Sequence, residues 1–303
     1  MSARPAAGGA GARAAWAGST ARAAHPWRVF ARRLFARRVV ALAALALLAV
    51  VALALAVSWV SVVDPNAIAI ARRLRAPSWE FWGGTDHLGR DVMLRVAYGG
   101  RYSLMIGFAT AIGAVVLGTL LGMLAGYFRW LDGPVMRVVD AMMAFPDILL
   151  GIALVAILGP SLWNVVLALV IVYTPRVARV ARASTLVLRD LLYVDAARAL
   201  GTPTWRILWM HVLPGLVSPV LVQLTFIFAY AILAEAGLSF LGVGVPPAIP
   251  TWGTMIAGSL SYMDKAFWTI VYPGLAIVLT SLSLQIVGDG IRDSLDPKLR
   301  KNT

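Results

Sequence analysis

Cysteine is absent from the 303-residue sequence, and lysine is nearly so. Without cysteine the chain forms no disulfides, thiolate nucleophiles, iron–sulfur clusters or cysteine-based zinc sites. The lysines are Lys265, Lys298 and Lys301, and none of them follows a glycine. Because the phosphate-binding loop of ATPases requires Gly-Lys-Ser/Thr, we expect this chain to bind no nucleotide. Any ATP and Mg²⁺ on which it depends would have to be bound by another polypeptide.

Charge of either sign is also scarce. Charged residues make up 14% of the sequence and hydrophobic residues 60%, and the mean hydropathy is +0.80. Soluble globular domains have about 25% charged and about 45–50% apolar residues, so we exclude a soluble, disordered or fibrous protein. In a soluble domain the net charge of +13 would indicate a nucleic-acid partner. Here apolar segments separate the arginines, which favours membrane topology and contact with lipid, with no nucleic acid.

Five long runs contain no Asp, Glu, Lys or Arg, and each exceeds the roughly 20 helical residues that span a bilayer. They cover residues 39–63, 102–128, 148–175, 207–234 and 266–288. The first run is too long for the apolar part of a signal peptide, which has about 7–15 residues, so we interpret it as an uncleaved anchor. The third run is interrupted by Gly159-Pro160-Ser161. It could be one long helix or most of two.

The distribution of arginine and lysine decides between five and six spans. With six spans and a cytoplasmic N-terminus, 20 of these residues lie inside and 7 outside, whereas five spans would place 11 inside and 16 outside. The positive-inside rule therefore favours six. The sequence predicts an all-α integral membrane protein with six transmembrane helices. The expected segments are a basic cytoplasmic tail (1–38), helices at 39–63 and about 102–126, 136–158, 161–176, 216–244 and 267–288, an extracytoplasmic loop (64–101), a cytoplasmic loop (177–215) and a cytoplasmic C-terminal tail (291–303).

Small residues recur at every fourth position of the second run, at Ala114, Gly118, Gly122 and Gly126. This spacing leaves one face of a helix almost bare. Lipid tails do not drive helices together, so close backbone approach must supply the contact. We therefore predict a tight helix pair through this face, either within the chain or with a partner subunit.

The cytoplasmic loop contains a short helix with recognisable ends. Asp195 suits the first turn, where the helix dipole favours an anion. Gly201 suits the left-handed position after the last residue, and Pro203 blocks continuation. A second helical stretch over 204–212 is expected to end before Pro214. A thin, alanine-rich helix can bind in a groove of another protein or lie on the membrane surface, and the residues alone leave both possibilities open.

The remaining polar residues indicate neither catalysis nor a metal site. In segment 84–91, Asp86 and Asp91 are expected to cap turns or to pair with Arg90. A metal site with His87 is not favoured, because the spacing matches no known ligand set. His25 and His211 lack visible partners for nucleophilic catalysis.

Charged residues near the predicted helices also bear on mechanism. Arg176, Arg179 and Arg182 recur at three-residue steps on one helix face, which we interpret as contact with anionic lipid headgroups. Ion-coupled carriers typically bury ionisable residues in mid-span. The acidic candidates for such a role all lie near span ends, which weakens that alternative; they are Asp140, Asp147, Glu235 and Asp289.

Motifs that follow one another along most of the chain resemble those of ABC-importer permeases. The stretch Asp195-Ala196-Ala197-x3-Gly201-x11-Leu213-Pro214 resembles their EAA loop, with Asp195 in place of the usual Glu. Further segments resemble the C-type subunit of the dipeptide/oligopeptide/nickel family, although Leu94 stands where Ser is usual. These segments are Gly84-Thr85-Asp86-x2-Gly89-Arg90-Asp91, Met136-Arg137-x2-Asp140-x4-Phe145-Pro146, Gly237-Leu238-Ser239-Phe240-Leu241-Gly242, Pro250-Thr251-Trp252-Gly253 and Gly288-Asp289-Gly290-x-Arg292-Asp293.

The resemblance implies a type I ABC importer permease fold in the bacterial plasma membrane, with a permease domain over 102–290. The chain would be half of a heterodimeric pore. Its partners would be a second homologous permease subunit, two ABC ATPase subunits and an extracytoplasmic substrate-binding protein. It would not itself be an enzyme, because the ATPase subunits hydrolyse ATP.

The resemblance also implies a role for the cytoplasmic loop. The helix around 195–201 would be the coupling helix that contacts an ATPase subunit, and the residues carried over are Asp195, Ala196, Ala197, Gly201, Leu213 and Pro214. The expected substrates are di- and oligopeptides. Nickel chelates, glutathione and other small solutes are alternatives of the same class, and an ion-coupled secondary carrier is the alternative of another class. No substrate-binding residue follows from the sequence.

Overall fold

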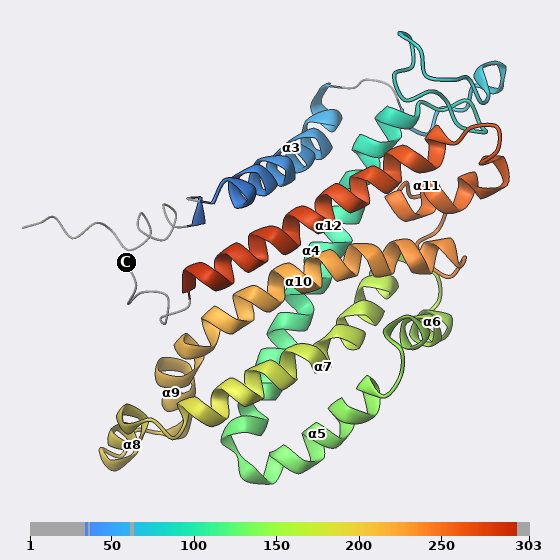
Figure 1. The fold of residues 1–303 in the computed structure, drawn as a ribbon. Helices are drawn as coiled ribbons and strands as arrows, with labels where there is room; N and C mark the ends of the chain where they lie inside the picture. Colours follow the sequence, from blue (N-terminus) through green and yellow to red (C-terminus); the bar gives the residue numbers. More distant parts are fainter. Residues whose placement is uncertain (1–33, 36, 61–63, 296–303) are drawn as a thin grey trace, which may run out of the picture.

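The computed structural model describes residues 34–35, 37–60 and 64–295. Most of the two predicted cytoplasmic tails and the end of the predicted first span therefore lie outside the described residues. Within them, the regular elements are helices, together with one isolated antiparallel bridge between Thr85 and Asp91. The helices form an elongated bundle, with short elements gathered at its two ends (Figure 1).

Long apolar helices make up the body of the bundle: α3 (Arg38–Val60), α4 (Val92–Tyr127), α7 (Leu162–Leu188), α10 (Leu213–Phe240) and α12 (Trp268–Leu295). These 5 are long and apolar enough to cross a membrane. The helices α5 (Arg129–Met143) and α6 (Asp147–Leu158) pass the same test only as a pair, and they meet at an angle of 97°. The count is thus 5 spans, or 6 if the bent pair is one span.

The bent pair corrects the straight helix that we expected over 136–158. Pro146 stands directly before α6 with φ −57° and ψ 132°, and α5 ends at Met143. Proline lacks the N–H that would continue the hydrogen-bond ladder, and it disfavours helical geometry at the preceding residue. The Ala144–Pro146 break therefore separates an amphipathic helix from an apolar one.

Three other helices, α4, α7 and α12, are longer than the sequence indicated, because each carries charged residues beyond its uncharged run. Helix α12 continues to Leu295 rather than ending near 288. Helix α4 begins at Val92 rather than near 102, and the side chain of Asp91 caps it by accepting from the Leu94 N–H at 3.0 Å. Helix α7 continues to Leu188 rather than stopping near 176. The loops predicted over 64–101 and 177–215 are correspondingly shorter.

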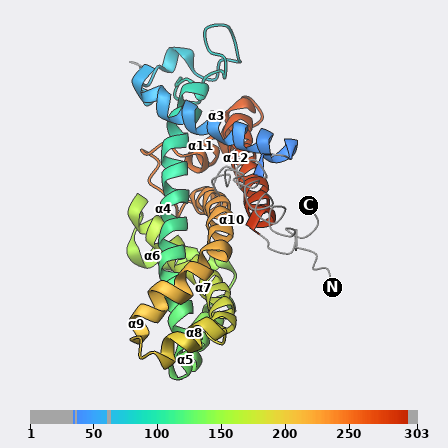
Figure 2. The same cartoon turned by 90° about the vertical axis from the view of Figure 1, so that its left-hand side faces the viewer.

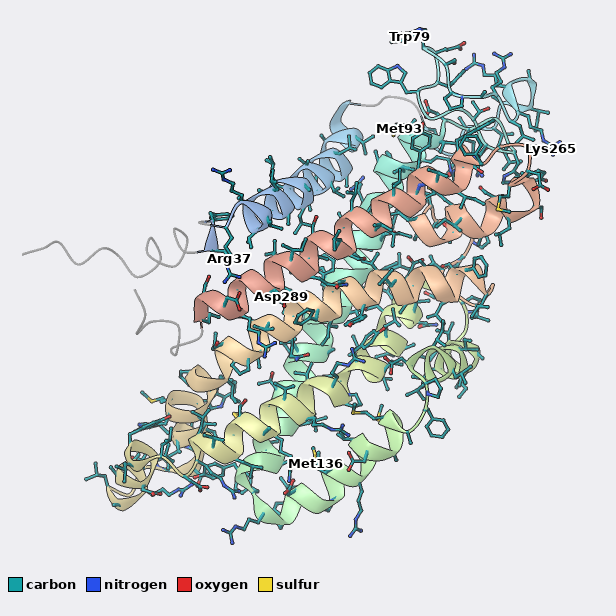
Figure 3. All side chains as sticks on the ribbon, in the orientation of Figure 1. Arg37, Trp79, Met93, Met136, Lys265 and Asp289 are labelled. Atoms are coloured by element: carbon teal, nitrogen blue, oxygen red, sulfur yellow. The ribbon has the colours of Figure 1, made fainter. Side chains whose placement is uncertain are left out.

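Short elements occupy opposite ends of the bundle. At one end lie segment 64–91, with the 3-10 turn η1 (Ile70–Arg72), helix α11 (Trp252–Ser259) and the 3-10 turn η3 (Leu260–Tyr262). At the other end lie α8 (Leu192–Ala199), α9 (Thr204–Ile207) and the π-helical turn η2 (Leu208–Val212). We call these the α11 end and the α8 end. Figure 3 shows Trp79 and Lys265 at the α11 end, whereas Met136 on α5 lies toward the other.

The main core lies where α7 packs against α4, α6 and α10. Helix α3 lies outside this core, against α12 and α4 (Figure 2). An ion pair between Arg37 and Asp293 joins the start of α3 to the end of α12. The outer faces of α3 and α12 expose large apolar side chains, among them Leu45 and Leu48 on α3 and Leu275 and Leu282 on α12. Such faces are unfavourable in water and suit contact with lipid or another subunit.

Candidate functional site: a docking helix and a charged helix interface

One side of helix α8 packs against the bundle, and the other side is exposed. Val194 and Ala197 are buried in a cluster with Ile207 and other apolar residues of α9 and η2. On the opposite side Leu192 is 88% exposed, and Leu200 just beyond the helix is 86% exposed. A leucine that is almost fully exposed at the end of a bundle, outside the apolar spans, is typical of a protein docking surface.

Polar contacts fix the direction of α8. Asp195 lies in its first turn, as expected, and accepts a hydrogen bond from Arg198 at 3.1 Å. The Arg198 guanidinium also lies 5.2 Å from the centre of the Tyr127 ring at the end of α4. The hydroxyl of Tyr193 donates to the carbonyl of His211 at 3.1 Å. Because the Arg198 contact reaches α4 and the Tyr193 hydrogen bond reaches η2, α8 is attached to two separate parts of the bundle.

Gly201 ends the helix in a complete Schellman motif. Its φ is +77°. The Gly201 N–H donates to the Arg198 carbonyl at 2.9 Å, and the Thr202 N–H donates to the Ala197 carbonyl at 3.1 Å. This pair of bonds requires the left-handed conformation that glycine adopts without steric cost. A Cβ added at Gly201 would meet nothing within 4 Å, so the requirement comes from the backbone conformation and not from space.

The helical path does not stop before Pro214, contrary to our expectation. It runs from α9 through η2 directly into α10, with Pro214 in the first turn of α10. A wide π-helical turn precedes this proline, and π turns relax the i→i−4 pattern that proline would break. Leu213 packs against the same apolar cluster as Val194, whereas Pro214 is exposed. Ala196 is exposed beside Asp195, so of the predicted coupling residues only Ala197 is buried and Leu213 partly buried.

The bare face of α4 lies against α7 of the same chain. A Cβ at Gly118 would come within 2.5 Å of Val177, and one at Gly122 within 2.3 Å of the Ala178 carbonyl oxygen. At Gly126 the nearest atom would be Thr185 Cβ at 2.7 Å. Ala114 is fully buried in the main core. The structure thus places this small-residue face in an intrachain helix pair, where backbones approach closely.

The arginines of α7 contact aspartates of α5 and α6, which corrects our interpretation that they reach lipid headgroups. Each of the three pairs joins α7 to one of these helices, and we call the set the Asp–Arg ladder. Its rungs are Arg182–Asp132, Arg179–Asp140 at 2.7 Å and Arg176–Asp147 at 3.3 Å. Sequence reasoning missed the ladder because the partners are 29 to 50 residues apart.

At the α11 end, Asp86 organises a tight turn. One of its carboxylate oxygens accepts from the N–H groups of Leu88 at 2.8 Å and Arg90 at 2.9 Å, and the other accepts from Arg90 Nε at 2.6 Å. Gly89 has φ +76° within this turn. The carboxylate therefore serves as a turn cap and ion-pair partner, as the sequence predicted. Among the described residues, no group of three His, Asp or Glu side chains is placed to hold a metal ion.

His87 projects from this turn and stacks on the ring of Tyr262, with 5.0 Å between ring centres. Its Nδ1 is buried without a hydrogen-bond partner. Burial lowers the pKa of His87 below its usual value of 6.5, since desolvation disfavours the charged imidazolium. His87 thus links segment 84–91 to η3 as a neutral ring.

Glu235 anchors the other side of the α11 end. It is 1% exposed, and its Oε1 accepts from Ser239 at 2.8 Å and from Thr251 at 2.7 Å. Thr251 is the N-cap of α11, where it forms a capping box with Thr254. Trp252, the first residue of α11, donates from its indole to the Val96 carbonyl at 2.9 Å. Glu235 therefore holds the start of α11 against α10.

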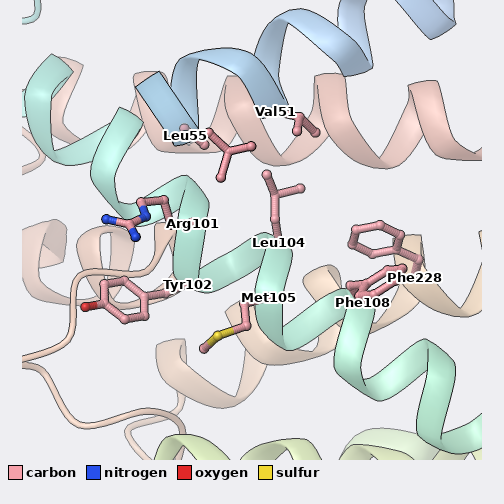
Figure 4. A pocket seen from close by; sticks show the side chains of 9 residues that line it. Val51, Leu55, Arg101, Tyr102, Leu104, Met105, Phe108 and Phe228 are labelled. Atoms are coloured by element: carbon pink, nitrogen blue, oxygen red, sulfur yellow. The ribbon is translucent and has the colours of Figure 1, made fainter. Parts of the chain in front are cut away.

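A cavity of about 450 Å³ opens between α3, α4 and α10 (Figure 4). Its lining is almost wholly apolar, including Leu55, Leu104, Met105 and Phe228, with Arg101 and Tyr102 at one side. Nothing in this lining resembles a catalytic or metal site. A crevice of this character between membrane helices is suited to an acyl chain or a neighbouring apolar side chain.

Residues 114–301 match the family described as "Binding-protein-dependent transport system inner membrane component". The chain belongs to this family. Members with similar sequences include a putative peptide transport system permease protein of Brucella suis, which is 48% identical over 80% of this chain and 82% of that protein. A dipeptide transport system permease protein of Alkalihalophilus pseudofirmus is 46% identical over 76% of each chain. A glutathione transport system permease protein of Pectobacterium atrosepticum is 42% identical over 91% of this chain and 92% of that protein.

The fold of this inner membrane component is shared with a solved transporter. An inward-facing structure of the MetNI methionine ABC transporter superposes with a TM-score of 0.56 at 18% identity, covering 68% of this chain and 98% of that chain. The predicted type I importer permease fold and the predicted family are therefore confirmed. As an inner membrane component of a binding-protein-dependent system, the chain is a multi-pass permease subunit that works with ATPase and binding-protein partners.

Proposed function

We propose that the chain is one of two homologous permease subunits of an ATP-driven importer of small peptides. The observation that carries this proposal is the combination of the family match with relatives named for peptide, dipeptide and glutathione transport. Glutathione is itself a tripeptide, so these relatives agree on one chemical class. The permease conducts the peptide and performs no chemistry on it.

In this proposal α8 is the coupling helix. Its exposed side, with Leu192, Asp195 and Leu200, contacts an ATPase subunit, and its buried side transmits the movement to α9, η2 and α10. Two ATPase subunits bind ATP and Mg²⁺, and their closure moves the coupling helices and switches the pore between outward-facing and inward-facing states. The contacts that attach α8 to both α4 and η2 support this role, since a loosely tethered helix could not transmit a displacement.

The orientation follows from the same assignment. The α8 end faces the cytoplasm with both termini, and the α11 end faces the substrate-binding protein outside. Each described arginine of α8 and α9 then lies on the cytoplasmic side, in agreement with the positive-inside rule.

The test is reconstitution of the complete complex in liposomes, with both permeases, both ATPases and the binding protein. We expect ATP-dependent uptake of a radiolabelled dipeptide and stimulation of ATP hydrolysis by the peptide-loaded binding protein. Uptake that requires an ion gradient and no ATP would contradict the proposal. Uptake of nickel chelates in place of peptides would contradict only the substrate class.

A further inference from the structure

Arg176 lies at the middle of a membrane-spanning helix. Helix α7 covers Leu162–Leu188, and at 1.5 Å per residue Arg176 lies about 21 Å from its start and about 18 Å from its end. Because Arg176 directly follows the uncharged residues 162–175, it borders the hydrocarbon region of the membrane, where an ionisable side chain is unfavourable against lipid. Such a side chain is found facing a protein interior or a water-filled path, where it commonly marks the route of a substrate.

The contacts of the Asp–Arg ladder lengthen from the α8 end toward Arg176, from a bidentate pair through 2.7 Å at Arg179–Asp140 to 3.3 Å at Arg176–Asp147. Exposure does not follow this order, since the Arg179 and Asp140 side chains are 51% and 63% exposed. At the rung nearest the α8 end, Arg182 binds both carboxylate oxygens of Asp132, and the two side chains are 30% and 28% exposed. At the deepest rung, Arg176 makes a single contact with Asp147 at 3.3 Å, and the side chains are 37% and 50% exposed. The first rung has the bidentate geometry of a fixed structural pair. The deepest has a longer single bond, which a competing ion can replace more easily.

Two aromatic rings also border the Arg176 guanidinium. It lies 5.1 Å from the centre of the Tyr230 ring on α10 and 5.9 Å from that of Tyr173 on α7. Tyr173 is buried and Tyr230 is 40% exposed. These rings hold the cation in one orientation, while its single bond to Asp147 uses one of the five N–H donors of the guanidinium.

This open, charged site contrasts with the surfaces of α3 and α12. Those helices expose leucine and valine along their outer faces, as lipid contact requires. The half-exposed charges of α6 and α7 therefore face a water-filled space, whose other wall would come from the second permease. Figure 1 shows α5, α6 and α7 on the opposite side of the bundle from α3.

We propose that Arg176 and Asp147 form a binding point for the charged termini of a peptide along the transport path. Arg176 binds the terminal carboxylate through its free N–H donors, and Asp147, released from the pair, accepts the α-ammonium group. A zwitterion replaces the internal ion pair without leaving either charge unpaired in a low-dielectric environment. This inference rests on the proposed peptide transport and deepens it, because it names the part of the substrate that the permease contacts.

The test compares two peptides in the reconstituted complex, dialanine and its C-terminal amide, for the wild type and for Arg176→Gln. Uptake of each peptide by the variant is divided by wild-type uptake, which cancels any preference of the binding protein. We expect Arg176→Gln to lower dialanine uptake by about tenfold or more, the typical effect of losing a charge-assisted hydrogen bond. Uptake of the amide should fall much less. Arg176→Lys, which keeps the charge and loses the planar fork, should give an intermediate loss for dialanine.

Arg179→Gln is the matched control. It neutralises the neighbouring rung, which has the same chemistry, and it should affect both peptides equally. If Arg176→Gln lowers the uptake of both peptides equally, or if Arg179→Gln discriminates between them to the same extent, the inference is wrong and the ladder is only structural.

Should the complex with Arg176→Gln fail to assemble, the ratio of dialanine uptake to amide uptake in Arg176→Lys decides in the same way. A wild-type complex that transports neither peptide would overturn the proposed function as well, whereas an unchanged ratio with normal wild-type uptake overturns this inference alone.

Discussion

At the scale of single residues, Gly201 is the position where one substitution should separate insertion from coupling. Its φ of +77° is strongly unfavourable for a β-branched side chain. Gly201→Val should therefore shift the end of α8 at a cost of about 1–3 kcal/mol. We expect normal membrane insertion but reduced uptake, and loss of the stimulation of ATP hydrolysis by loaded binding protein in the reconstituted complex.

Two further variants make this experiment specific. Gly201→Asn should be mild, because asparagine tolerates the left-handed region and a Cβ at this position meets nothing within 4 Å. Asp195→Ala should also do less, since an exposed charge near a helix start contributes about 0.3–1 kcal/mol. Wild-type stimulation and uptake in Gly201→Val would show that α8 is not the coupling element.

His87 should make the α11 end sensitive to pH. Its pKa in the folded protein is lowered from 6.5 by burial, so the folded state binds the proton less tightly than the unfolded state does. The stability contributed by the neutral ring is then fully present above pH 6.5 and is lost as the pH falls below that value. The protection of segment 84–91 against hydrogen exchange, relative to the intrinsic exchange rate at each pH, should fall between pH 7.5 and pH 5 in the wild type. The neutral variant His87→Gln should lose most of this change, and an equal fall in protection in both proteins would exclude His87 as the cause.

Residue-level features were predictable where the partners are close in sequence. The caps at Asp86 and Asp91 and the left-handed Gly201 depend on bonds within four or five residues, so the local pattern determines them. The ladder rung Arg176–Asp147 and the bond between Thr251 and Glu235 span 29 and 16 residues. They exist only because helices pack side by side, and no spacing in the sequence indicates which helices meet.

At the scale of elements, the long apolar helices could be predicted from the uncharged runs, but the helix ends could not. A run ends at the first charge, whereas a helix ends where its backbone loses hydrogen-bond partners. Arg95 and Arg101 lie inside α4, and Arg182 lies inside α7 paired with Asp132. Helix α11 was not predicted, because it is only 8 residues long and too short for a span.

The pairing of α4 with α7 gives an element-scale prediction. Gly122→Leu would place a side chain where even a Cβ comes within 2.3 Å of the Ala178 carbonyl oxygen, and overpacking of this kind costs about 1–3 kcal/mol. We expect a lower midpoint of thermal unfolding in detergent and a poorer yield of assembled complex. Gly274→Leu is the matched control on α12, where an added Cβ meets nothing within 4 Å. Equal effects of the two substitutions would show that the close approach at Gly122 is not what limits stability.

At the scale of the whole molecule, the absence of cysteine offers a direct test of orientation. A cysteine introduced at Leu200 or Trp79 would be the only thiol of the chain, and both positions are highly exposed. A membrane-impermeant maleimide added to intact cells, after removal of any outer membrane, should label Trp79→Cys and Ala248→Cys but not Leu200→Cys. After the membrane is opened, all three should react. Labelling of Leu200→Cys in intact cells would contradict the six-span topology and place α8 on the wrong side for any ATPase.

The surfaces of the molecule also predict that it is incomplete by itself. One side exposes the apolar faces of α3 and α12, and another exposes the half-open charges of the Asp–Arg ladder, so no single environment suits both. Lipid covers the first side, but a second permease is needed beside the second, since polar groups exposed to hydrocarbon are strongly unfavourable.

With no Gly-Lys pair in the sequence, the purified chain should bind no fluorescent ATP analogue, whereas the complete complex should bind it. In liposomes the chain alone should take up no peptide, with or without an ion gradient, and uptake should appear only when the second permease, the ATPases and the binding protein are added. Peptide uptake by the isolated chain would mean that the ladder side is closed by the chain itself, and that the permease is not half of a pore.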